Sequence, residues 1–333
     1  MIAETVNTAR PPQAFCWPAG FVLGLLLMAA GFPGRGQEAE LDSTPFRIGF
    51  SHGVFNNINE NDAKAAVKVW GQTIARERGI PTDPDPCIFQ NTPELLKALR
   101  GNLVDAVGIT IIEYAALNRD VRFAPIFITY NSGSSRDQYL VLVHRDSKLE
   151  HLADLRGRSL ALHQDLRDCL AQPWLDTLLI QEEGKPAVEW FGRITQSTKI
   201  SQVVLPVFFH QSDACVVTRT GFKTMCELNP QLGQQLKVIA RSPELVTAVF
   251  CFRADYAPAF KEKVFAGVRN LYKTLAGQQV LTIFRCEKLE DQPASCLDST
   301  LELVAQHAQL VNSQATKAPL PESPPQLPKG FNP

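Results

Sequence analysis

The chain has 333 residues, 45% hydrophobic and 20% charged, with a formal net charge of -1 at pH 7. That length is sufficient for two domains of ordinary size, each with its own hydrophobic core. The balanced charge excludes a strong attraction to nucleic acid or to an anionic membrane surface, so neither is expected as a partner. Strand and helix patterns alternate along almost the whole chain, which favours an α/β architecture over a helical bundle or a β-sandwich.

An apolar run occupies residues 19–32, with Arg10 before it and the small residues Gly34 and Gly36 after it. This order is typical of a secretory signal peptide, so we expect residues 1–36 to be cleaved on export to the periplasm. An uncleaved membrane anchor is the alternative, although prolines bracket the run and leave it short of the roughly 20 apolar residues that a spanning helix needs.

The cysteines that follow this run match neither the spacing of a zinc site nor that of a redox motif, so no metal and no cofactor are expected. Cys286 and Cys296 flank a short polar loop and are candidates for a local disulfide. Cys215 and Cys251 lie in apparent core strands and are expected as buried thiols. No cysteine has a His and an Asn or Asp arranged to activate it, so no catalytic residue is expected.

Candidate ligand contacts in the first half of the chain lie where strands end. The first expected strand ends at Ser51, and a buried strand ends with Thr110. In a doubly wound sheet the carboxyl ends of the strands border the ligand crevice, so both hydroxyls are candidates. Tyr130, in the polar loop that follows the next expected strand at 123–128, is a third. Glu113 is interpreted as an acid that stabilises a helix start.

A short pattern occurs once in each half of the chain. After a helix, the dipeptide Asp-Ala, an apolar strand and a terminal Thr are found at residues 105–110 and, after the helix expected at 203–209, again at 213–218. This repeat predicts two similar α/β lobes that face one cleft. Thr218 is then the counterpart of Thr110, and we expect the two side chains to approach each other across that cleft.

Residues 138–162, QYLVLVHRDSKLEHLADLRGRSLAL, combine a buried strand, a turn, two expected helical turns at 149–155 and a second strand. This order resembles the segment by which type 2 periplasmic solute-binding proteins cross from their first lobe into their second. An ordinary βαβ connection of another α/β protein is the alternative. The resemblance makes Tyr139, at the crossing, a candidate ligand contact, and it implies a hinge near Gln138, Tyr139 and Thr247.

The resemblance extends from residue 46 to about residue 280 through LVDAVGITIIEYAAL, the crossing segment, SDACVVTRTGF and LKVIARSPEL. It is specific to the branch that binds phosphate, phosphite and phosphonates. It implies two similar α/β lobes joined by two crossover strands, with a ligand cleft between them. The expected parts are a first lobe at 45–138 and 249–312, a second lobe at 139–248, helices at 258–276 and 300–309 on the outside of the first lobe, and a proline-rich disordered tail at 313–333.

The chain departs from that branch at one place. Where the family carries a Ser-Thr-Ser-Gly-like run before a helix, this sequence has Leu166-Arg167-Asp168-Cys169. Asp168 would repel a phosphonate dianion, and Arg167 offsets that repulsion only if it turns inward. His163 and Gln164 end the strand after the crossing and face the same cleft, and for His163 a structural role is the alternative to ligand contact.

These observations predict a noncatalytic periplasmic component of an ABC-type transport system. It would close its lobes on a small anionic or zwitterionic ligand, such as a phosphonate, a phosphate or a related oxyanion, and deliver it to a membrane permease. A ligand-sensing protein that acts on a membrane sensor is the second hypothesis, and an enzyme on the same scaffold is the third. The candidate ligand contacts are Ser51, Thr110, Tyr130, Tyr139, His163, Gln164, Arg167, Asp168 and Thr218.

Overall fold

The computed structural model describes residues 44–55, 59–131 and 133–317. The expected signal peptide at 1–36 and most of the expected proline-rich tail lie outside these residues, as does the side chain of Arg167. The described residues all belong to one compact unit. Within the described part of the chain, no helix has both the length and the apolar character needed to cross a membrane.

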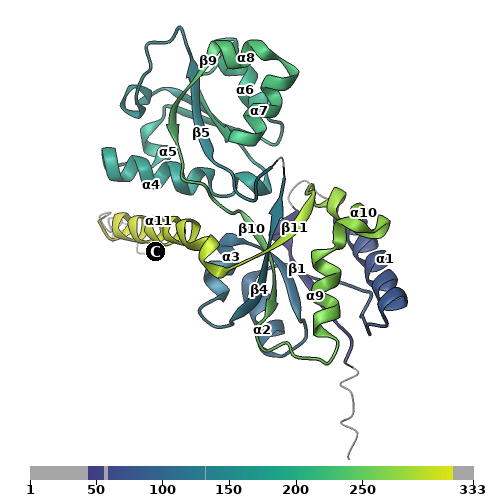
Figure 1. The fold of residues 1–333 in the computed structure, drawn as a ribbon. Helices are drawn as coiled ribbons and strands as arrows, with labels where there is room; N and C mark the ends of the chain where they lie inside the picture. The colour runs from purple at the N-terminus through teal and green to yellow at the C-terminus, as the bar shows by residue number, and fades with distance from the viewer. Residues whose placement is uncertain (1–43, 56–58, 132, 318–333) are drawn as a thin grey trace, which may run out of the picture. The chain divides into compact units, whose positions relative to one another are not determined.

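The first lobe is built on a sheet of six strands in the order β11-β4-β10-β3-β1-β2. Strands β1 to β4 come from the first half of the chain, whereas β10 and β11 come from its second half, so this lobe is discontinuous in sequence (Figure 1). The strands are β1 Ile48–Ser51, β2 Cys87–Phe89, β3 Ala106–Thr110, β4 Phe123–Tyr130, β10 Ala248–Arg253 and β11 Lys288–Gln292.

The helices of the first lobe cover both faces of its sheet. Phe127 and Phe252 point to one face and pack with α1, α9 and α10, whereas Val107 and Cys251 point to the other and pack with α2, α3 and α11. The helices are η1 His52–Phe55, α1 Glu60–Arg78, α2 Thr92–Arg100, α3 Ile111–Leu117, α9 Lys261–Arg269, η4 Leu271–Lys273, α10 Leu275–Ile283, η5 Ala294–Leu297 and α11 Asp298–Lys317.

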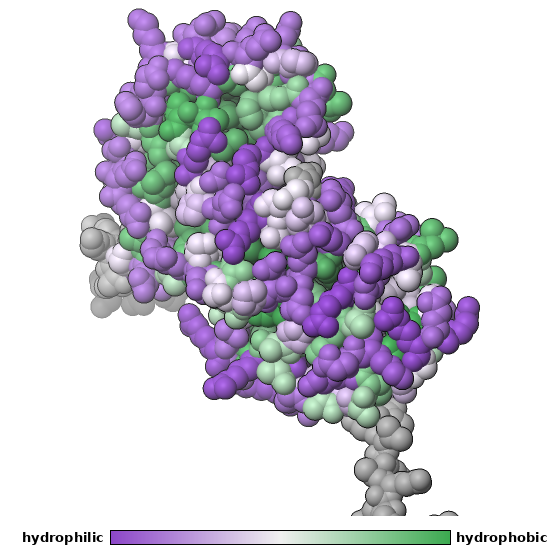
Figure 2. Space-filling model, viewed as in Figure 1, coloured by the Kyte–Doolittle hydropathy of each residue, from purple (hydrophilic) through white to green (hydrophobic). Residues whose placement is uncertain are grey.

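The second lobe has a sheet of five strands in the order β7-β6-β8-β5-β9, again with helices on both faces. Its strands are β5 Tyr139–His144, β6 Ser159–His163, β7 Arg193–Ser197, β8 Ala214–Thr218 and β9 Leu236–Arg241. Its helices are η2 Leu152–Leu155, η3 Leu166–Asp168, α4 Ala171–Glu183, α5 Ala187–Trp190, α6 Ser201–Phe208, α7 Arg219–Leu228 and α8 Pro230–Gln235. The face of the molecule in Figure 2 carries many hydrophilic residues with hydrophobic areas between them. Inside the lobes, the apolar side chains gather in buried clusters.

The two lobes share one strand order. The order β2-β1-β3-β10-β4 in the first lobe corresponds to β7-β6-β8-β5-β9 in the second. Strands β1 and β6 each run parallel to both neighbours, and β10 and β5 each run antiparallel to both of theirs. The prediction of two similar α/β lobes is therefore confirmed, and β11 is an addition at one edge of the first sheet.

The repeated sequence pattern has the same structural role in both lobes. The Arg47 N–H donates to Asp105 Oδ2 at 2.9 Å, and the Ser159 N–H donates to Asp213 Oδ2 at 2.8 Å. Each carboxylate thus binds the backbone where the neighbouring parallel strand begins. At the other end of each repeated strand, the terminal Thr is the N-cap of the next helix.

The two chain segments that join the lobes pair with each other. Asp137 and Leu245 exchange both backbone hydrogen bonds, at 3.1 and 2.8 Å. The Tyr139 N–H donates to Ser242 Oγ at 2.8 Å. The Thr247 carbonyl accepts the Ile111 N–H of the first lobe at 2.9 Å. The two expected crossings are therefore present and lie side by side.

The expected helix at 258–276 is wrong as one continuous element. The chain forms α9, η4 and α10 there, because Asn270 ends α9 and Thr274 starts α10 by accepting the Gly277 N–H at 3.1 Å. The short helix expected at 149–155 is limited to the 3-10 turn η2.

Helix α11 is longer than expected and is placed differently. It continues to Lys317, past residue 313, where the proline-rich tail was expected to begin. It packs against α4 of the second lobe as well as α3 of the first, so its expected place on the outside of the first lobe is wrong. Nε2 of His307 in α11 lies 3.8 Å from Oδ2 of Asp176 in α4.

The proposed disulfide is also wrong. Cys286 belongs to the apolar cluster on one face of the first sheet and Cys296 to the cluster on the opposite face, and the two are not joined by a disulfide. The sheet between them prevents the sulfur atoms from meeting. Cys215 and Cys251 are fully buried free thiols, as expected from their strand positions.

Asp105 and Asp213 make the same backbone contact at different degrees of burial, so replacing each one tests how burial changes its contribution to stability. The side chain of Asp105 is 4% exposed and pairs with Arg47 and Arg253, whereas that of Asp213 is 33% exposed. Asp105→Ala should lower the free energy of unfolding by about 3 kcal/mol, because it removes the buried carboxylate that pairs with Arg47 and leaves the buried Arg253 with the exposed Asp255 as its carboxylate partner. Asp213→Ala should cost about 1 kcal/mol, since water reaches the groups it leaves. Urea unfolding of both variants measures this difference, and equal losses would contradict it.

Candidate ligand-binding site

Three side chains at the strand ends of the first lobe form one hydrogen-bonded group. Ser51 Oγ donates to Glu113 Oε2 at 2.6 Å, and the N–H and Oγ1 of Thr110 donate to the same oxygen at 2.9 and 2.8 Å. Thr110 Oγ1 also accepts the Glu113 N–H at 3.3 Å, which completes a capping box. The interpretation of Glu113 as a helix-start acid is confirmed. The two hydroxyls are bonded to Glu113 and are not turned outward as donors.

Gly53 connects this group to a cavity at the contact between the lobes. A Cβ atom added to Gly53 would lie 3.0 Å from Thr110 Cγ2 and 3.5 Å from both carboxylate oxygens of Glu113. Gly53 also borders a cavity of about 270 Å³ whose other walls come from the second lobe. The polar residues of those walls are His163, Gln164, Asp165, Asp168, Gln172 and Gln196.

His163 and Asp168 form a buried ion pair in this wall. Nδ1 of His163 lies 2.7 Å from Oδ2 of Asp168, and their side chains are 11% and 1% exposed. Nε2 of His163 lies 3.3 Å from the Thr198 carbonyl oxygen. Both partners accept hydrogen bonds, so the doubly protonated imidazolium satisfies both. The second oxygen, Asp168 Oδ1, is buried and has no hydrogen-bond partner among the described residues.

The pair perturbs the protonation of both groups. Burial alone would lower the pKa of His163, but the hydrogen bond and the charge of Asp168 outweigh it, so this pKa is raised above its usual value of 6.5. Burial raises the pKa of Asp168, and His163 offsets only part of that effect. The negative charges of Asp165 and Asp137 raise the pKa of Asp168 further.

The turn η3 also contacts the first lobe directly. Asp165 Oδ2 lies 3.2 Å from Nη1 of Arg285, which comes from the end of α10. The side chain of Leu166 packs against the apolar cluster of the first lobe, where Phe50 and Phe284 stack with ring centres 5.3 Å apart. The residues on either side of the cavity are thus held together by an ion pair and an apolar contact.

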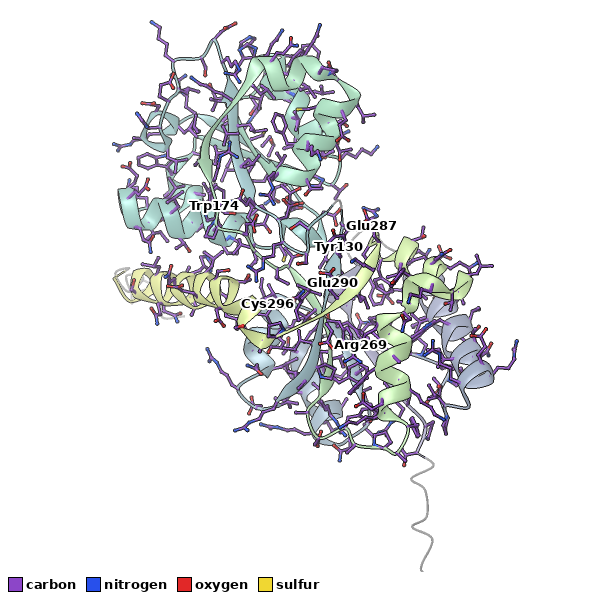
Figure 3. The ribbon with its side chains drawn as sticks, in the orientation of Figure 1. Tyr130, Trp174, Arg269, Glu287, Glu290 and Cys296 are labelled. Carbon is purple, nitrogen blue, oxygen red and sulfur yellow. The ribbon has the colours of Figure 1, made fainter. Side chains whose placement is uncertain are left out.

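Both tyrosines predicted as ligand contacts lie away from the cavity. Tyr139 is a core residue, a correction to its expected role: it is 1% exposed, its ring stacks on that of Trp174 with centres 6.1 Å apart, and its hydroxyl oxygen accepts the Leu170 N–H. Tyr130 lies at the end of β4, where Lys288 Nζ is 4.2 Å from the centre of its ring. Figure 3 shows Tyr130 beside the strand β11 of the first lobe.

Thr218 is an N-cap and not a cavity residue. Its Oγ1 accepts the Gly221 N–H at 3.1 Å, and the residue is 5% exposed. It therefore does not line the cavity that Gly53 and Asp168 share. His163, Gln164 and Asp168 do line it, whereas Ser51 and Thr110 reach it only through Glu113 and Gly53.

Several residues of the cavity wall were missed from the sequence. Gln196 lies near the end of β7, so the strand-end rule would have found it if the strand had been recognised in RITQS. Cys169 borders the cavity, but burial raises its thiol pKa to about 12, so it is a poor nucleophile. Gly53 has no side chain from which a ligand contact could be predicted. Asp165 follows His163 and Gln164 directly, so the argument that strand ends border the ligand crevice applied to it as well.

Two lobes of one strand order, joined by two crossing segments and meeting at a polar cavity, define a type 2 periplasmic binding protein. The model of the family described as the phosphonate-binding periplasmic protein of ABC transporters matches residues 53–294. The chain belongs to this family, whose members bind a small molecule and work with the membrane permease of an ABC transporter.

Solved structures agree with this fold. XAC2383 from Xanthomonas citri bound to ATP is 15% identical with a TM-score of 0.58, over 81% of this chain and 99% of that one. PhnD1 from Prochlorococcus marinus in complex with methylphosphonate is 12% identical with a TM-score of 0.51, over 81% of this chain and 99% of that one. No curated protein matches the chain.

The His163–Asp168 pair makes a pH-dependent contribution to stability. The raised pKa of His163 stabilises the folded state below pH 6.5, and this contribution is lost as the pH rises through the folded pKa. The raised pKa of Asp168 acts in the same direction, because the folded state then holds its proton more tightly than the unfolded chain.

Asp168→Asn should lower the pKa of His163, because it removes the carboxylate whose charge and hydrogen bond raise that pKa. NMR titration of the His163 ring measures the change.

Asp165→Asn is the matched control for this titration. Asp165 contributes only a charge, the last of the effects that raise the pKa of His163, whereas Asp168 contributes the hydrogen bond as well. The control should lower the pKa of His163 by less than Asp168→Asn does. A His163 pKa that is the same with and without Asp168 would contradict the assignment of the pair.

Proposed function

We propose that this protein is a noncatalytic periplasmic binding protein that captures a small solute between its lobes and delivers it to a membrane permease. The observation that carries the proposal is the cavity of about 270 Å³ with walls from both lobes. Gly53 contributes from the first lobe, and His163, Gln164 and Asp168 contribute from the second. A ligand held by both lobes binds the closed arrangement better, and that difference in affinity shifts the population toward it.

The hinge of this motion is proposed near Gln138, Tyr139 and Thr247. Only a few residues of the two crossing segments need to change their backbone angles, while each lobe keeps its own sheet. The contacts of Thr247 support this position. Its carbonyl accepts the Ile111 N–H of the first lobe and lies 3.8 Å from Cys169 Sγ of the second, so it stands at the junction of the two.

A cavity-filling substitution tests the proposed site. Gln172 borders the cavity from the start of α4 and is exposed, and Gln181 is exposed on the same helix but does not border it. A thermal-shift screen of phosphate, phosphite, phosphonates, sulfonates and amino acids should yield a stabilising compound, since a ligand at a hundred times its dissociation constant adds about 2.7 kcal/mol. Gln172→Trp should abolish the shift and Gln181→Trp should keep it.

The result that counts against the site is equal behaviour of the two tryptophan variants. If the identified compound still stabilises Gln172→Trp, ligand binds elsewhere. Capture of a membrane kinase or cyclase by the ligand-loaded protein, in place of a permease, would favour the sensing role. Turnover of the compound by the purified chain would make the protein an enzyme on this scaffold.

Export is a separate prediction. The apolar run at 19–32 followed by Gly34 and Gly36 has the order of a signal peptide, so the protein recovered from a native-like host should lack roughly its first 36 residues. Mass spectrometry of the intact protein measures this loss. Recovery of the Met1 end in the membrane fraction would indicate an anchored protein.

A further inference from the structure

We propose that the ligand of this protein carries a short apolar group, and that this group enters an apolar cavity inside the first lobe. The polar part of the ligand stays in the cavity that Gly53 and His163 border, named here the polar cavity. The inference rests on the proposed binding function and names the chemical class of the ligand. It starts from Leu166 of η3, which borders both the polar cavity and a separate apolar cavity of about 90 Å³.

The apolar cavity lies on one face of the first sheet, between the strands and the helices α1, α9 and α10. Phe50 of β1 points to this face. Ala248 and Phe250 of β10 do so too, because every second side chain of a strand points the same way. Ala248 pairs with Thr110 at the ligand side of the sheet. It has only a methyl group there, so no large side chain of β10 closes this end of the space.

The walls of the apolar cavity offer little to a water molecule. Among the described residues that line it, only Trp70, Thr129 and Cys286 have a polar side-chain group. A buried water needs two to four polar partners, whereas a cavity of about 150 Å³ lined by Leu, Ile and Phe stays dry and binds benzene. In the same proportion, a cavity of about 90 Å³ has room for about four carbon atoms.

The apolar cavity opens toward the polar one. Val268 in its helix wall is buried, whereas Phe250, Phe284 and Leu166 are half-buried, so these three residues mark its mouth. Of the described residues that line it, Leu166 alone comes from the second lobe, and it packs against the apolar cluster there. A half-buried leucine on a three-residue turn can change its rotamer without disturbing a sheet. One side chain therefore separates the two cavities.

An apolar group in this space gains affinity without losing hydrogen bonds. Each CH2 group moved from water into an apolar site should tighten binding by about fourfold. A wholly polar ligand fills only the polar cavity and gains nothing from the apolar one. The two cavities together therefore favour a ligand that joins a polar group to a short alkyl chain.

The experiment compares compounds that share a polar group and differ only in chain length. We would measure dissociation constants by calorimetry for methylphosphonate against propylphosphonate, methanesulfonate against propanesulfonate, acetate against butanoate and methylamine against propylamine. The propyl member of at least one pair should bind at least about tenfold more tightly, since it buries two further CH2 groups.

Two matched variants locate the apolar group. Ala248→Phe fills the mouth of the apolar cavity and should reduce the preference for the propyl member to less than about threefold. Ala240 is likewise a half-buried alanine in a strand, but it borders neither cavity, so Ala240→Phe should keep the preference. Thermal unfolding verifies that each variant is folded. If Ala248→Phe does not fold, Leu166→Trp takes its place, because it blocks the same passage from the second lobe.

The outcomes separate this inference from the function on which it rests. If compounds bind but no propyl member binds more tightly than its methyl partner, the inference is wrong and the binding function stands. A preference that survives in the folded blocking variant, or that is also lost in Ala240→Phe, would overturn the inference as well, because the apolar cavity would not be its source. If no compound binds to the unmodified protein at millimolar concentration, both the inference and the proposed site are wrong.

Discussion

The architecture of each lobe depends on a carboxylate that binds the start of a neighbouring parallel strand. Asp105 accepts the N–H before β1, and Asp213 accepts the N–H that begins β6. Because these strands are short and run straight to the ligand side, fixing where they start also fixes where Ser51 and His163 emerge. One interaction, made twice, thus sets where His163 enters the cavity wall and where Ser51 stands beside Glu113.

The chemistry around the cavity comes from side chains at the ends of strands and helices. Ser51 and Thr110 donate to Glu113, and the turn before α4 carries Asp168. These side chains are separate from the apolar residues within the strands, so the cavity chemistry can differ while the strand order stays the same.

The sequence predicts features that depend on local patterns and misses those that depend on contacts between distant segments. The two lobes follow from the repeat around Thr110 and Thr218, since Asp-Ala, an apolar strand and a cap are local signals. The bond between Ser51 and Glu113 joins residues 62 positions apart, and no pattern shows which partner a hydroxyl chooses. Cys286 and Cys296 are close in sequence yet lie on opposite faces of a sheet, which periodicity over so short a loop cannot reveal. Tyr139 has the strand position of a cleft residue, but its ring packs on Trp174 inside the lobe.

Helix α11 sets a geometric condition on any rotation of one lobe against the other. It is fixed to the first lobe through η5 and α3, and it packs along α4 of the second. A rotation axis far from α11 would slide these surfaces apart and expose apolar area, at about 25 cal/mol for each Å². An axis that runs along the helix avoids that cost. Each atom of the rotating lobe is then displaced in proportion to its distance from this axis. If the lobes rotate, a helix that adds no side chain to the described cavity wall would therefore set the direction in which the cavity widens.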